Sequence, residues 1–200
     1  MSGGKRTDSG TPREADTPRR DAARSRAAIL DAAEQIAQRR GAGHLSIEAV
    51  AAEAGLSKGG VLYHFPSKVR MLEALVELHV ARTETALAHH RAELGETVPN
   101  ALARALIETF RERRDATPQN ATGLFAALAE NPEFLAPARS FQADLVARLR
   151  AESDDPELAL IVFLCTEGVR SLRLFGSESL DDAGTEAVLR RLDALLGDSG

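Results

Sequence analysis

The chain has 200 residues, of which 44% are hydrophobic and 4% aromatic, and its formal net charge is −5. Alanine and leucine dominate, and no run of alternating apolar and polar residues is long enough for a strand, so we expect an all-α fold. The single cysteine, Cys165, excludes an intramolecular disulfide and a cysteine-rich metal site, and the longest apolar run is too short to span a membrane.

The amino-terminal part of the chain is basic and the remainder is acidic. Residues 22–70 contain seven Lys/Arg and four Asp/Glu, whereas residues 71–200 contain thirteen and twenty-two. The net charge argues against a nucleic-acid partner, but the basic amino-terminal part is compatible with one. We expect a cytoplasmic protein, because one cysteine suits a reducing compartment and residues 1–21 lack the apolar core of a signal peptide.

An arm and a first helix open the chain. Residues 1–21 are rich in Ser, Thr, Gly, Pro and charged residues, so we expect them to form a disordered arm. Apolar residues then recur at helical spacing from Ile29 to Ala37, and Gly41 is placed to end this first helix.

The next stretch predicts two short helices joined by a glycine turn. Ser46 is the expected N-cap of a two-turn helix that Gly55 ends, and Ser57 is placed to cap a third helix. This third helix runs to about His64, before Pro66. A glycine-containing turn between two short helices is typical of the helix-turn-helix motif, whose second helix enters the major groove of DNA.

Gly59 and Gly60 lie inside the third predicted helix, where each glycine costs about 1 kcal/mol relative to alanine. Two explanations are open: the pair belongs to a flexible loop, or the missing side chains let the helix backbone approach DNA closely. The flanking motif favours the second explanation. The spacing from Val61 assigns Phe65 to the core and Tyr63 to the surface.

The rest of the chain is predicted as further helices, about nine in all, with no internal repeat. A long fourth helix follows Pro66-Ser67, and a short helix is expected over 124–128. Capping residues or first-turn prolines mark the other expected starts, which are Pro99, Asn131-Pro132, Asp155-Pro156 and Asp181-Asp182.

The amino-terminal helices resemble a known DNA-binding domain. The segments that carry the resemblance are AAILDAAEQIAQRRG and LSIEAVAAEAGLSKGGVLYHFPSKVRMLEAL, and the family is the TetR family of transcriptional regulators. The resemblance implies a helix-turn-helix domain over 22–68 and a helical ligand-binding and dimerisation domain over 69–200. It also implies a homodimeric repressor that binds a palindromic operator in double-stranded DNA and is released by a small-molecule inducer, with no cofactor.

Carried onto this sequence, the resemblance assigns DNA contacts to Arg24, Arg26, Ser46, Ser57, Lys58, Gly59, Gly60, Tyr63, His64 and Lys68. Lys58 would donate to guanine, whereas Tyr63 and His64 would contact phosphates or thymine methyl groups. The chain departs from the family pattern at Gly60 and Leu62, where Thr or Ser and Tyr are usual. DNA shape and the amino-terminal arm would then contribute more to recognition, although the arm can also be a solvated tail without a role.

The helix over 158–175 has apolar residues on more than one face, so it must bury two sides. One side can pack into its own core, and the resemblance implies that the other joins the last helix in a four-helix bundle with a second copy. A monomer core is the alternative, and Cys165 is either a buried inert thiol or an oxidant sensor. The predicted interface residues are Leu158, Val162, Cys165, Val169, Leu172, Val188, Leu192 and Leu195.

A ligand pocket is expected between the later helices. An aromatic stripe at helical spacing is also what a plain core looks like, and Glu167 can simply pair with Arg170 on one helix. The candidate lining residues are His79, Phe110, Phe125, Leu128, Phe134, Phe141, Leu145, Phe163, Glu167 and Arg170.

Two other functions are alternatives to a DNA-binding regulator. A helical metalloenzyme would use His79, His89 or His90, but Glu77 and His79 are two residues apart and point to different faces of their helix. No phosphate-binding or dinucleotide fingerprint occurs, so we expect no catalytic residue and no enzyme. A helical ligand-binding or interaction protein that has lost specific DNA binding is the other alternative, and the departures in the third helix support it.

Overall fold

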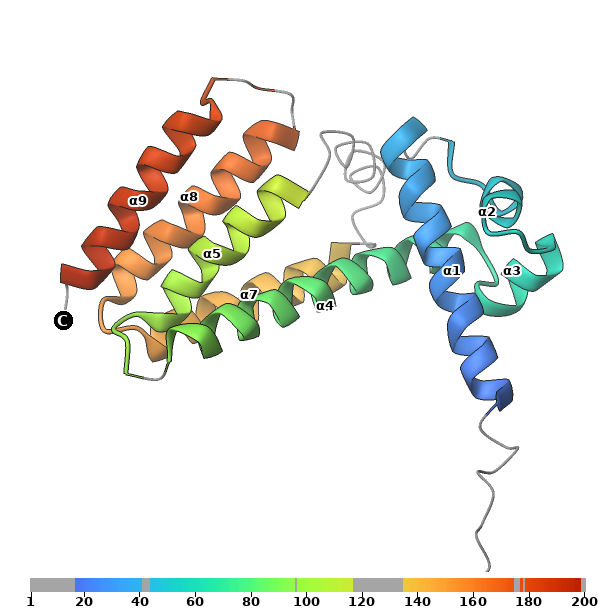
Figure 1. Ribbon diagram of the computed structural model, residues 1–200, viewed down its shortest axis with the longest axis horizontal. Coiled ribbons are helices and arrows are strands. Elements are labelled where there is room, and N and C mark those ends of the chain that lie inside the picture. The colour runs from blue at the N-terminus through green and yellow to red at the C-terminus, as the bar shows by residue number, and fades with distance from the viewer. Residues whose placement is uncertain are drawn as a thin grey trace, which may run out of the picture.

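The computed structural model describes residues 17–40, 44–95, 97–116, 135–174, 177 and 179–198. The described residues form eight helices and no strand (Figure 1), which confirms the predicted all-α fold. The helices are α1 Thr17–Arg40, α2 Ile47–Glu53, α3 Lys58–His64, α4 Lys68–Leu94, α5 Ala101–Ala116, α7 Ala136–Glu152, α8 Pro156–Leu174 and α9 Asp182–Asp198. The helix predicted over 124–128 lies outside the described residues.

The helix α1 begins earlier than the composition predicts. Its first residue is Thr17, so residues 17–21, which we assigned to the arm, are helical. Pro18 is tolerated in a first helical turn, and the Arg and Ala residues that follow are good helix formers, which explains the early start. The remainder of the predicted arm, residues 1–16, lies outside the described residues.

One hydrophobic cluster holds α1, α2, α3 and the first turns of α4 together. Its members recur at helical spacing on α1, which is why α1 presents one apolar stripe to the shorter helices. The largest fully buried side chains of this cluster are Ile29, Leu45, Val50, Val61 and Met71.

A second hydrophobic cluster joins the carboxy-terminal half of α4 to α5, α7, α8 and α9. In Figure 1, α5, α8 and α9 lie side by side at the end of α4 that is remote from α3. The largest fully buried side chains here are Leu87, Leu102, Ile107, Leu149, Leu189 and Leu196.

The long helix α4 belongs to both clusters. Met71 and Leu75 pack in the first cluster, whereas Leu87 packs in the second. The helix ends at Gly95, which has φ +86°, a backbone conformation that glycine adopts without the strain of a side chain. Because α4 is continuous, it connects the helix-turn-helix part directly to the remaining helices (Figure 1).

Some predicted helix starts are confirmed and others shift. α8 begins at Pro156, and the Asp155 carboxylate accepts a hydrogen bond of 2.9 Å from the Leu158 N–H, as a capping residue does. α5 begins two residues after Pro99, because Asn100 has φ +54° and interrupts the helical backbone.

The helix α7 begins at Ala136, after the predicted start at Asn131-Pro132. Leu135 is at its N-cap position without a side-chain hydrogen bond, and a proline stands in the first turn. A first-turn proline therefore does open this helix, but it is Pro137.

Candidate DNA interface and ligand region

The helices α2 and α3 are joined by the glycine turn that the sequence predicts. Ser46 Oγ accepts a hydrogen bond of 3.0 Å from the Ala49 N–H, and Ser57 Oγ accepts one of 3.0 Å from the Gly60 N–H. Gly55 has φ +66°, which lies in the left-handed region that favours glycine. The predicted caps and the helix–turn–helix geometry are thus confirmed.

Neither glycine of α3 is required by its own chain. A Cβ atom at Gly59 would lie 3.9 Å from Ser57 Oγ, and one at Gly60 would lie 3.4 Å from the same atom. Both glycines are inside a helix, so the loop explanation is wrong. No clash within the described residues therefore requires glycine at these two positions, where each glycine costs about 1 kcal/mol relative to alanine, and close approach to DNA stays a prediction.

The aromatic residues of α3 separate as the spacing predicts. Tyr63 is 81% exposed, whereas Phe65 is 3% exposed and packs with Val61 in the first cluster. The Tyr63 and His64 rings meet edge to face, with centroids 5.1 Å apart. α3 therefore presents an aromatic side chain to the surface while it is anchored in the core.

Lys58, the predicted base donor, is held by a carboxylate that sequence reasoning missed. Its Nζ lies 2.6 Å from Glu48 Oε1, and both side chains are exposed. The hydrogen bond and charge of Lys58 lower the pKa of Glu48, so this carboxylate is ionised at neutral pH. Glu48 and Lys58 are ten positions apart in the sequence, and no periodicity pairs a residue of α2 with the first residue of α3.

The other predicted DNA contacts lie in the amino-terminal half of α1 and at the first position of α4. The Arg24 side chain is 80% exposed. The Arg26 guanidinium carbon lies 5.1 Å from the centroid of the Phe65 ring, a cation–π contact that fixes this side chain beside α3. Lys68 is exposed at the first position of α4, next to the capping residue Ser67.

The predicted ligand region contains a buried contact between a histidine and an arginine. Arg113 Nη2 lies 3.0 Å from His79 Nδ1, and the imidazole nitrogen is the acceptor because a guanidinium only donates. Burial, followed by the charges of Arg113, Arg170 and Arg82, lowers the pKa of His79 to about 4. His79 is therefore neutral at neutral pH.

Two predicted ligand residues of α8 pair with each other. Arg170 Nη1 contacts Glu167 Oε1, and Gln142 Nε2 donates a hydrogen bond of 3.0 Å to Glu167 Oε2. The pairing along one helix that the spacing allowed is thus observed. Sequence reasoning missed Gln142, Arg82 and Arg113, because only the packing of separate helices brings them to this site.

The apolar residues of the predicted pocket fall into two groups. Phe110 and Leu145 are buried in the second cluster, and Phe141 and Phe163 pack partly buried against it, as the plain-core alternative expects. The other three, Phe125, Leu128 and Phe134, lie outside the described residues.

An ion pair ties α1 to the part of α4 beside His79. Arg82 Nη1 donates to both carboxylate oxygens of Glu34, at 3.0 and 2.8 Å. Glu34 belongs to the first helix of the helix-turn-helix part, whereas Arg82 lies on α4 three residues after His79. The charges around His79 therefore extend to the DNA-binding helices.

The exposed apolar residues of α8 and α9 are only partly those predicted for the dimer interface. Val162 and Leu192 are buried in the core of the same chain, and Leu158, Cys165 and Val169 pack partly buried against that core. The interface prediction is wrong for Val162 and Leu192, because two stripes on α8 have helical spacing and the sequence does not say which one faces its own core. For Leu158, Cys165 and Val169 it stays a prediction. The exposed apolar side chains are Ile161 (48%), Leu164 (66%), Leu172 (39%) and Val188 (39%).

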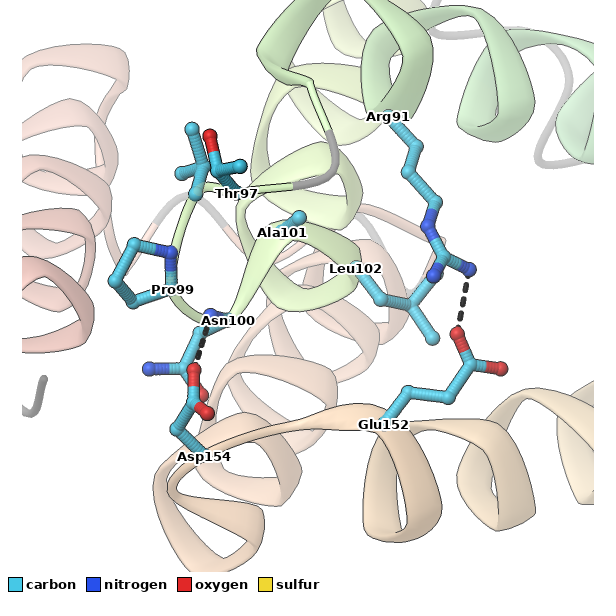
Figure 2. Close-up of a pocket in the computed structure, with 9 residues that line it drawn as sticks. Arg91, Thr97, Pro99, Asn100, Ala101, Leu102, Glu152 and Asp154 are labelled. Atoms are coloured by element: carbon cyan, nitrogen blue, oxygen red, sulfur yellow. Dashed lines mark hydrogen bonds and ion pairs between the residues drawn. The ribbon is translucent and has the colours of Figure 1, made fainter.

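A polar pocket of about 330 Å³ lies where the end of α4, the start of α5 and the end of α7 meet (Figure 2). Arg91 and Glu152 form an ion pair of 2.5 Å across it. Asn100 joins three segments at its edge: its backbone N–H donates to Asp154 at 3.1 Å, and its side chain donates to the Leu196 carbonyl at 3.0 Å. These bonds are internal to the chain, so the pocket is a structural corner remote from α3.

Two of the histidines that suggested a metalloenzyme, His89 and His90, contact carboxylates, and the third, His79, contacts Arg113. His90 lies between Glu93 and Glu112, with its two ring nitrogens 3.3 and 2.9 Å from their carboxylate oxygens. Within the described ranges, no group of three His, Cys, Asp or Glu is arranged to hold a metal ion. Of the helices that the structure describes, none is long and apolar enough to cross a membrane.

A capped two-turn helix, a glycine turn and an exposed short helix define a helix-turn-helix protein, and comparison with known families agrees. Residues 29–75 match the model of bacterial regulatory proteins of the tetR family, and residues 100–197 match the tetracyclin repressor-like C-terminal domain. The chain belongs to the TetR family and is a DNA-binding transcriptional regulator. Neither matching model describes a catalytic domain. No curated protein matches the chain.

Solved structures share this fold over most of the chain. The multidrug binding protein EbrR complexed with imidazole is 24% identical, with a TM-score of 0.66, and the match covers 92% of this chain and 97% of that one. A TetR-family member from Streptomyces coelicolor A3 is 25% identical, with a TM-score of 0.66 and coverage of 84% and 97%. NalD, the secondary repressor of the MexAB-OprM pump in Pseudomonas aeruginosa, is 18% identical, with a TM-score of 0.58 and coverage of 90% and 96%.

Proposed function

We propose that the protein is a cytoplasmic repressor that binds a near-palindromic operator as a homodimer and leaves it when a small molecule binds. The observation that carries the DNA contact is α3, where an exposed Tyr63 stands beside two glycines that the chain itself does not need. Close backbone approach to DNA gives those glycines a function. Lys68, at the exposed start of α4, supplies a phosphate contact in this proposal.

The test is binding of the full chain to the promoter region nearest its own gene, measured by fluorescence anisotropy across a salt series. We expect tighter binding to a palindrome in that region than to the same bases in scrambled order. The logarithm of affinity should fall linearly with the logarithm of salt concentration. Equal affinity for both duplexes at every salt concentration would contradict sequence-specific binding.

The exposed apolar faces of α8 and α9 support the dimer. Ile161, Leu164 and Leu172 lie at helical spacing on α8, and Val188 adds to them from α9. A second copy can cover this face by a two-fold, self-complementary contact. Such a dimer would place two α3 helices about 34–36 Å apart, one helical turn of DNA.

The alternative is a helical ligand-binding or interaction protein that has kept the fold and lost specific DNA binding. The Glu48 carboxylate beside Lys58 favours it, since a negative charge at this position opposes contact with phosphates. Lys58→Ala and Tyr63→Ala separate the two proposals, because each should weaken operator binding only if α3 contacts DNA. If neither substitution changes the affinity, the alternative is the better description.

A further inference from the structure

Arg113 is a partly buried cation with an uncharged partner. Its guanidinium donates to the neutral imidazole of His79 at 3.0 Å. Burial lowers the pKa of Arg113, and so do the nearby charges of Arg170 and Arg82. In the part of the chain that the structure describes, no carboxylate forms an ion pair with Arg113. The ionised guanidinium is thus kept in an environment that disfavours it.

The neighbouring arginines differ from Arg113 in this respect. Arg82 is paired with Glu34, and Arg170 is paired with Glu167. Glu112 and Glu34 favour the charged form of Arg113 through their negative charges but form no ion pair with it, and His79 supplies no negative charge. The three guanidinium groups around one neutral ring therefore form a site that a further anion would stabilise.

We propose that Arg113, with His79 fixing its guanidinium and Arg170 and Arg82 adding positive charge, binds the carboxylate of a small organic acid. This acid is the ligand of the proposed repressor, so the inference rests on the proposed function. A carboxylate matches the planar fork of a guanidinium and can accept two parallel hydrogen bonds from it. A neutral molecule of the same shape would leave the charge of Arg113 without an anion.

Arg82 connects the proposed acid site to α1. Arg82 already lies between the charges near His79 and the Glu34 carboxylate of α1. A bound carboxylate attracts Arg82 and competes with Glu34 for it, so ligand binding weakens the ion pair between α1 and α4. The ligand then has different affinities for two arrangements of the DNA-binding helices, which is the requirement for releasing an operator.

Thermal unfolding of the full chain at constant ionic strength tests the site without DNA. The probes are the sodium salts of hexanoic, octanoic, benzoic and phenylacetic acids, each compared with its primary amide. At about a hundredfold excess over its dissociation constant, an acid that binds only the folded protein should raise Tm by about 5–10 °C. We expect such a shift from at least one acid and none from its amide.

Two variants show whether the shift belongs to Arg113. Arg113→Met should fold with an unchanged or higher Tm, since it removes a partly buried charge, and should lose the response to the acid at least tenfold. Arg91→Met, which breaks the ion pair with Glu152 at the far end of α4, should respond as the wild type does. Equal responses of the wild type and Arg113→Met, equal responses to acid and amide, or no response to any of the four acids would each overturn the proposal.

The two proposals fail separately in this design. If the wild type binds its operator but no acid stabilises it more than it stabilises Arg113→Met, the acid site is wrong and the repressor remains. If an acid stabilises the wild type through Arg113 but no operator binding is found, the acid site stands and the repressor is wrong.

Discussion

Replacing Gly59 by alanine should stabilise the protein and weaken its binding to DNA. A Cβ at this position would meet Ser57 Oγ at 3.9 Å and nothing closer, so α3 accommodates it. Alanine in place of a helical glycine raises the free energy of unfolding by about 0.5–1 kcal/mol, which raises Tm by about 1–4 °C in a chain of this size.

The DNA-bound state should respond in the opposite direction. If the α3 backbone lies against the DNA, an added methyl group overfills the contact, at a cost of about 1 kcal/mol or more in each subunit. Two subunits on one operator then lose about 2 kcal/mol, which corresponds to a roughly thirtyfold weaker affinity.

Thermal unfolding and anisotropy titration of the same preparation measure both quantities. Gly197→Ala in the last turn of α9 is the matched control: its Cβ would contact Arg104 Nη1 at 3.7 Å, so it should stabilise without changing DNA affinity. A Gly59→Ala protein with higher Tm and unchanged affinity would show that this glycine does not approach DNA. A lower Tm would refute the helix-propensity reasoning itself.

Three further substitutions test the remaining parts of the site. Leu164→Glu should convert the dimer to monomers in light scattering and weaken operator binding, because it places a charge in the exposed apolar face of α8; an unchanged mass would exclude this face. Glu48→Gln should tighten operator binding by about twofold to tenfold, because Lys58 loses its competing carboxylate; a weaker complex would mean that Glu48 positions Lys58. His79 has a folded pKa of about 4, below its usual 6.5, so the stability it supports is present above about pH 6.5 and is lost as the pH falls toward 4. His79→Gln should flatten the dependence of denaturant midpoints on pH in that window, and an unchanged slope would contradict the neutral, buried imidazole.

The fold was predictable where local chemistry decides it. Ser46, Gly55 and Ser57 are capping and turn residues whose hydrogen bonds and dihedral angles depend on immediate neighbours, and the structure has them as predicted. Phe65 is buried and Tyr63 is exposed, as the spacing predicts, since one helical turn separates Phe65 from Val61. Local rules were sufficient for this part because its helices are short and strongly capped.

The ligand region and the proposed dimer face were only partly predictable from the sequence, because contacts between helices that are distant in the sequence decide which of their residues are buried. Val162 and Ile161 are adjacent apolar residues on α8, and only packing against neighbouring helices makes the first buried and the second exposed. Arg113 and His79 are 34 residues apart, and no periodicity joins them. The burial that lowers the pKa of His79 is likewise a property of the packed helices, so its neutral state was not visible in the sequence.

The free energy of the ion pair between α1 and α4 limits how far a ligand that breaks this pair can lower the affinity for DNA. Glu34 and Arg82 are partly exposed, and pairs of this kind contribute about 0.2–1 kcal/mol. A dimer has two of them, so their complete loss supplies at most about 2 kcal/mol, whereas a hundredfold release from DNA requires about 2.8 kcal/mol. The remainder has to come from apolar packing between α1 and α4, where Met71 and Leu75 share the first cluster with Ile29. An acid at Arg113 therefore releases the operator only if it shifts α4 in that cluster as well as drawing Arg82 away from Glu34.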